Sequence, residues 1–88
     1  MKKIIEDNYN SIVNRGLISN DTTKIQFINK IFEEVGELEY FYYENNGEID
    51  TLELADIILT CLNMAKHYNI DIESELKRKI KFNQKRKD

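Results

Sequence analysis

The sequence contains no proline among its 88 residues and only three glycines, so few positions can interrupt a helix. Apolar residues recur at helical spacing along nearly the whole chain, and no segment shows the alternation typical of a β-strand. Hydrophobic residues make up 41% and charged residues 33%, a balance typical of folded rather than disordered chains. We therefore predict one all-α domain over residues 1–88, with a core small enough that oligomerisation would complete it.

Turn and cap residues divide the chain into four expected helices. The first ends at Arg15-Gly16, and the second is expected to be capped by Asn20 or Asp21 and to end before Asn45-Asn46-Gly47. Asp50 and Asp71 are the expected caps of the third and fourth. The predicted helices cover residues 2 to about 14, about 22 to 43 or 44, 51 to 67 or 68, and 72 to about 85.

Every charged residue from Glu33 to Asp56 is acidic. Residues three or four apart share a helix face, so Glu34 pairs with Glu37 and Glu53 pairs with Asp56. If their two helices form a hairpin, the four carboxylates converge and repel one another. Mg²⁺, a hard cation that prefers oxygen ligands, would relieve this repulsion, and Mn²⁺ could replace it.

Glu34 is the most informative residue of this acidic segment. It lies between Ile31 and Leu38 on a mainly apolar stripe, where a carboxylate costs several kcal/mol unless it is paired or metal-bound. Glu53 has a competing structural explanation, because it stands at capping-box spacing from Asp50. The single histidine, His67, lacks the Glu-x-x-His spacing of di-iron bundles, which argues against iron.

The C-terminal segment has the opposite charge, since every charged residue from Lys77 to Lys87 is basic. Lys79, Asn83 and Arg86 share one helix face, where the two cations could hold phosphate oxygens and Asn83 a phosphate or a sugar. A solvated helix end with cations near the negative end of its dipole explains the same pattern. Charge alone favours that simpler interpretation.

Taken together, these motifs resemble a known family. Glu33-Glu34-x-x-Glu37, 15 intervening residues and Glu53-x-x-Asp56 resemble the signature of the MazG-type nucleotide pyrophosphohydrolases, in the all-α NTP pyrophosphatase superfamily. Arg15-Gly16, Gln26 and Lys30 resemble the family's lead-in to the Glu-rich helix. Lys79-x-x-x-Asn83-x-x-Arg86 resembles its C-terminal basic motif, so the resemblance extends over roughly residues 8 to 87.

The resemblance implies a four-helix MazG-type bundle, completed by a homodimer or homotetramer with sites between subunits. It implies Mg²⁺-dependent hydrolysis of a nucleoside triphosphate, (d)NTP, to the monophosphate and pyrophosphate. Glu33 and Glu37 would be catalytic, Glu33 as a further ligand or as the group that orients water. The implied metal ligands are Glu34, Glu37, Glu53 and Asp56, and the residues implied to face phosphates and sugar are Lys30, Lys79, Asn83 and Arg86.

Three other functions stay open at this point. A related enzyme could hydrolyse phosphoribosyl-ATP. A helical nucleic-acid-binding or regulatory protein could use the basic segment 77–87, although the net charge of −3 argues against it. An inactive interaction module is the third, and the retained set of four carboxylates argues against it. With one cysteine, Cys61, and no apolar run near the roughly 20 residues that span a bilayer, we expect a cytoplasmic protein without a membrane partner.

Overall fold

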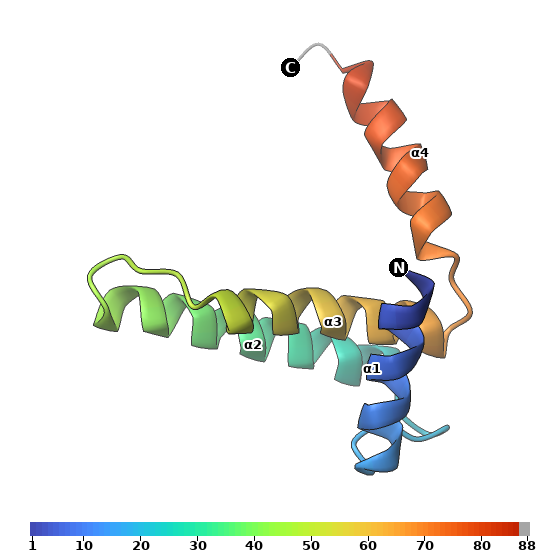
Figure 1. Cartoon of the computed structure of the whole chain (residues 1–88), viewed down its shortest axis with the longest axis horizontal. Helices are drawn as coiled ribbons and strands as arrows, with labels where there is room; N and C mark the ends of the chain where they lie inside the picture. Colours follow the sequence, from blue (N-terminus) through green and yellow to red (C-terminus); the bar gives the residue numbers. More distant parts are fainter. Residues whose placement is uncertain (87–88) are drawn as a thin grey trace.

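The computed structural model describes residues 1–86, which form four α-helices and no strand (Figure 1). The helices are α1 (Lys2–Asn14), α2 (Lys24–Glu44), α3 (Thr51–His67) and α4 (Ile72–Gln84). The predicted all-α class is therefore confirmed. None of these helices is long and apolar enough to cross a membrane within the described range.

Local sequence explains most helix ends, with one correction. The N-cap of α2 is Thr23, so the prediction of Asn20 or Asp21 was wrong. Thr23 and Gln26 form a capping box: the Thr23 hydroxyl accepts from the Gln26 N–H at 3.3 Å, and Gln26 Oε1 accepts from the Thr23 N–H at 2.7 Å. Two otherwise unsatisfied donors are paired in this way, which favours a start at Thr23.

α2 and α3 form an antiparallel hairpin, and α1 crosses it near the end of α3 (Figure 1). The hydrophobic core lies at this crossing. Tyr9 of α1 contributes its hydroxyl, which lies 2.8 Å from His67 Nδ1. The buried residues are Ile18, Phe27, Glu34, Leu62, Asn63 and Ala65.

α4 points away from the other helices and packs substantially on none of them (Figure 1). Its apolar residues Leu76, Ile80 and Phe82 are all exposed. The radius of gyration is 15.0 Å, whereas a compact domain of this length has one of about 12 Å. The accessible surface is 7160 Å², against about 5,400 Å² for a folded monomer of this mass. Within one chain the four helices therefore do not close into a bundle, and the oligomeric MazG-type bundle stays a prediction about an assembly.

Candidate functional site

The middle of the α2–α3 interface is polar. Glu34 of α2 is only 8% exposed, and it lies against Thr60 of α3. The Thr60 hydroxyl lies 2.9 Å from Glu34 Oε2 and 2.9 Å from the Asp56 carbonyl oxygen, so it can donate to either. Lys30 Nζ lies 3.9 Å from the other Glu34 oxygen. Glu34 is thus a buried carboxylate with one hydroxyl and one half-exposed cation beside it.

The surroundings of Glu34 favour its protonated form. Burial is the main cause that raises its pKa, and the charges of Asp56 and Glu37 raise it further. The Thr60 hydrogen bond and the Lys30 charge oppose these effects without cancelling them. The Thr60 hydroxyl and the Lys30 charge therefore do not fully offset the cost of burying the negative charge of Glu34.

Glu53 is perturbed more strongly. Burial, a hydrogen bond shared with Glu37, and the charges of Glu37, Glu34 and Asp56 raise the pKa of Glu53 to about 7. Its Oε1 atom is buried and has no hydrogen-bond partner among the described residues. The four carboxylates predicted from the sequence, which act on one another across the hairpin, are hereafter called the carboxylate cluster: Glu34, Glu37, Glu53 and Asp56.

The competing structural explanation for Glu53 is only half realised. Asp50 Oδ1 accepts hydrogen bonds from the backbone N–H groups of Leu52 and Glu53, each at 3.1 Å. Asp50 thus caps α3, whereas the Glu53 side chain does not complete a reciprocal capping box with the Asp50 backbone, and its Oε1 atom has no partner among the described residues. Helix capping therefore does not account for the Glu53 side chain.

The donor chemistry of the cluster fits a hard divalent cation. All its ligand atoms are carboxylate oxygens, and the buried Glu53 Oε1 lacks a partner. As the side chains stand, no group of three or more His, Cys, Asp or Glu in residues 1–86 is arranged to hold a metal ion. Without a cation, the like charges of these carboxylates repel one another, which favours side-chain positions that are far apart. The side chains of Glu37 and Asp56 are exposed, so they can rotate towards a bound cation.

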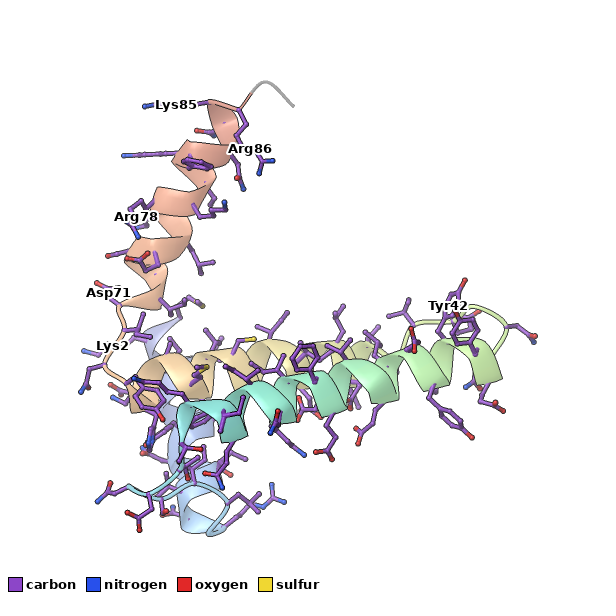
Figure 2. All side chains as sticks on the ribbon, turned by 180° about the vertical axis from the view of Figure 1, so that it is seen from behind. Lys2, Tyr42, Asp71, Arg78, Lys85 and Arg86 are labelled. Atoms are coloured by element: carbon purple, nitrogen blue, oxygen red, sulfur yellow. The ribbon has the colours of Figure 1, made fainter. Side chains whose placement is uncertain are left out.

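The other predicted site residues fall into two groups. Lys30 borders the cluster, and its Nζ lies 3.6 Å from Glu33 Oε1. Glu33 is exposed on the outer side of α2 and is not among the charges that act on Glu34 or Glu53. The residues on α4 form the second group, and this helix points away from the hairpin that carries the cluster (Figure 1). Lys79 Nζ lies 4.6 Å from the centroid of the Phe82 ring on the same helix. Figure 2 shows Arg86 at the outer end of that helix, so one chain does not bring Lys79, Asn83 and Arg86 to the carboxylates.

Two polar side chains of α3, Thr60 and Asn63, were not among the predicted site residues. Thr60 bonds Glu34, and its position one turn after Asp56 was the available signal. Asn63 Oδ1 accepts a hydrogen bond from Asn8 Nδ2 at 2.8 Å, which ties α1 to α3. Nothing local in the sequence pairs residues 55 positions apart.

Comparisons of the chain with protein-family models, with curated proteins and with solved structures found no match. The MazG-type resemblance therefore depends on the motif residues themselves.

The raised pKa of Glu53 gives a prediction for stability against pH. The folded protein binds this proton more tightly than the unfolded chain, in which the ordinary value is 4.5. The contribution is complete below that value and is lost as pH rises through about 7. We expect the melting temperature of the metal-free protein to fall, relative to Glu53→Gln, between pH 5 and 8. Thermal melts of both proteins across this range test it, and parallel curves would contradict it.

Proposed function

We propose that this protein is a metal-dependent nucleoside triphosphate pyrophosphohydrolase of the MazG type, which hydrolyses (d)NTP to (d)NMP and pyrophosphate. The observation that carries the proposal is the carboxylate cluster. Carboxylates of α2 and α3 act on one another across the hairpin, Glu34 is 8% exposed, and Glu53 has a buried oxygen without a partner among the described residues. An interface that only had to pack would be more stable with apolar residues at these positions.

The roles are those that the resemblance implies, and the positions of Thr60 and Lys30 beside Glu34 support them. Glu34, Glu37, Glu53 and Asp56 would hold Mg²⁺, or Mn²⁺ in its place. The bound metal would neutralise phosphate charge and lower the pKa of a water molecule. Thr60 orients Glu34 through its hydroxyl. Lys30 stands at the edge of the cluster, where its ammonium can meet a phosphate oxygen, and Glu33 beside it is our second catalytic carboxylate.

The proposal requires a second copy of the chain. Phosphoryl chemistry depends on charge neutralisation, and α4, which carries the basic residues, packs substantially on neither helix of the carboxylate cluster in its own chain. Phe32 and Leu52 are 71% and 78% exposed on the hairpin. The chain exposes about 1,700 Å² more surface than expected for its mass, and a standard dimer interface covers about 800 Å² per partner. We therefore propose a homodimer or homotetramer in which basic α4 meets the acidic hairpin of a partner.

The direct test is pyrophosphate release from a panel of NTPs and dNTPs, with and without Mg²⁺. We expect metal-dependent release that falls at least about a hundredfold in Glu37→Gln, since loss of a ligand should exceed the usual cost of losing an outer-shell partner. Glu39→Gln is the matched control, because Glu39 is exposed on the same helix and outside the cluster.

Thermal melts extend the test to the metal. Mg²⁺ should raise the melting temperature of the wild type and not that of Glu37→Gln. No release from any nucleotide, together with no shift by Mg²⁺, would refute the proposal.

The exposed basic α4 also fits a helical nucleic-acid-binding or regulatory protein. That function predicts binding to single- or double-stranded oligonucleotides that weakens steeply with salt. It also predicts that neutralising the carboxylate cluster would leave binding intact or strengthen it. The enzyme predicts the loss of activity in the same variants.

A further inference from the structure

A cavity of about 340 Å³ lies beside the carboxylate cluster. Helices α1, α2 and α3 and the connection between α1 and α2 all contribute to its walls. Glu34 and Thr60, which belong to the polar α2–α3 interface, also line this cavity. A molecule held in the cavity therefore touches the same carboxylate that would help bind a metal.

The far wall of the cavity is apolar. It is formed by Ile12 of α1, Leu17 and Ile18 of the connection, and Phe27 of α2. Ile18 and Phe27 are buried, whereas Leu17 is 60% exposed at the opening. The volume lies at the lower end of the range for small-molecule sites, about 300–1,000 Å³. This apolar part suits a flat ring system, whereas the rest of the lining is polar and includes Thr22, Gln26 and Lys30.

Asn63 adds an amide group to the lining of this cavity. Its side chain lines the cavity and is only 6% exposed. The Asn8 bond occupies Asn63 Oδ1, and Asn63 Nδ2 has no acceptor among the described residues. This amide therefore has a donor to offer to a ligand carbonyl or ring nitrogen in the cavity. Each common base carries such acceptors on its edge.

We propose that this cavity binds the base of the nucleotide substrate, with Asn63 donating to the edge of the ring. The inference rests on the proposed function, and it adds that the substrate is recognised through a heterocycle rather than through its phosphates alone. The base would occupy the apolar end, near Ile18 and Phe27. The sugar and phosphates would extend past Glu34 and Lys30, towards the carboxylate cluster.

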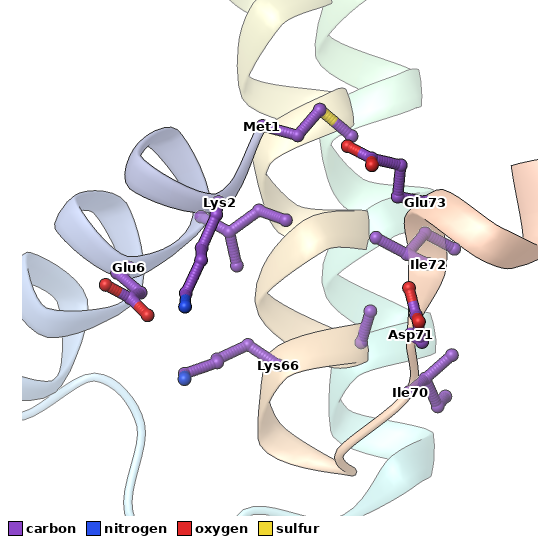
Figure 3. Close-up of a pocket in the computed structure, with 10 residues that line it drawn as sticks. Met1, Lys2, Glu6, Lys66, Ile70, Asp71, Ile72 and Glu73 are labelled. Atoms are coloured by element: carbon purple, nitrogen blue, oxygen red, sulfur yellow. The ribbon is translucent and has the colours of Figure 1, made fainter.

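A second cavity of similar size supplies an internal control. It has a volume of about 320 Å³ and lies where α1, the end of α3 and the start of α4 meet (Figure 3). Lys2, Lys66 and Glu73 line it, and the figure shows no residue of the carboxylate cluster there. Ile70 is one of its apolar lining residues and is 46% exposed. The lining of this second cavity includes neither an asparagine nor Glu34.

The test uses nucleosides without phosphates, so that the metal site is not engaged. Nucleosides carrying each common base are titrated into the ¹⁵N-labelled full chain, and backbone amide shifts are followed by NMR. We expect shifts at Ile18, Phe27 and Asn63 for at least one base. Leu17→Trp, which places a large ring at the opening, should weaken binding at least about tenfold. Ile70→Trp makes the same change at the control cavity and should leave binding unchanged.

A conservative variant separates recognition from packing. Asn63→Asp keeps an acceptor for Asn8 but removes the donor, so nucleoside affinity should fall at least about tenfold while the helical spectrum is retained. Shifts confined to the control cavity, equal effects of the two tryptophan variants, or no nucleoside binding would overturn the inference. Hydrolysis of triphosphates without nucleoside binding would overturn only the base site. Nucleoside binding at this cavity without hydrolysis would overturn only the proposed enzyme.

Discussion

Replacing Glu34 with leucine is expected to stabilise the metal-free protein and to abolish pyrophosphate release. The two effects have one cause. Glu34 is 8% exposed on a stripe between Ile31 and Leu38, and burial raises its pKa, so the folded protein holds an unfavourable carboxylate. An isosteric apolar side chain removes that cost and, with it, a proposed metal ligand.

The partners of Glu34 do not reverse this expectation. When Glu34 is removed, the Thr60 hydroxyl still has the Asp56 carbonyl oxygen at 2.9 Å, so it keeps an acceptor. Lys30 loses an ion pair at 3.9 Å, but its side chain is 53% exposed and remains hydrated. Neither group is left buried and unsatisfied.

We expect Glu34→Leu to gain about 1 kcal/mol in the free energy of unfolding, which corresponds to a melting temperature higher by about 4–8 °C for a domain of this size. Thermal melts in EDTA and pyrophosphate assays in Mg²⁺ measure the two effects. Glu39→Leu is the control, because the same substitution at an exposed position of α2 buries little surface. A lower melting temperature for Glu34→Leu would show that Glu34 is structurally required through Thr60 or Lys30.

Local chemistry made the helices predictable. The missing prolines, Gly16 in the left-handed region at φ 76°, and the caps Asp50 and Asp71 fix where helices begin and end. The start of α2 was misplaced because several cap residues adjoin there. The deciding contact was the reciprocal one between Thr23 and Gln26.

The site was predictable only one helix at a time. Spacing of three residues places Glu34 with Glu37 and Glu53 with Asp56, and a short loop makes an antiparallel hairpin natural. The convergence of the pairs was a conditional prediction: the α2–α3 hairpin that it requires is present, but no three of these side chains within residues 1–86 are arranged to hold a metal ion, so the convergence stays a prediction. The partner of α4 was not predictable, because an amphipathic stripe shows that a helix buries a face without showing against what. Leu52 of α3 illustrates the same gap: it is apolar and yet 78% exposed within one chain.

Two inactive variants are expected to regain activity when they are combined in one oligomer. Glu37→Gln disables the carboxylate cluster, and Lys79→Ala removes a cation from α4. If each site joins the cluster of one chain to α4 of another, a mixed dimer contains one doubly altered site and one intact site. Purified heterodimer should therefore show about half of the wild-type activity, since one of its two symmetry-related sites is unaltered.

The reason for expecting this result is the distance between the charges that the chemistry must combine. α4 packs substantially on no other helix of its own chain, and the Lys79 ammonium lies over Phe82 instead of facing a carboxylate. The heterodimer is obtained by co-expression with two different tags and is assayed for pyrophosphate release. A heterodimer of Glu37→Gln with Glu53→Gln is the matched control, because both changes fall in the cluster and each site keeps one of them. If the first heterodimer stays as inactive as the control, α4 serves the cluster of its own chain or does not serve it at all.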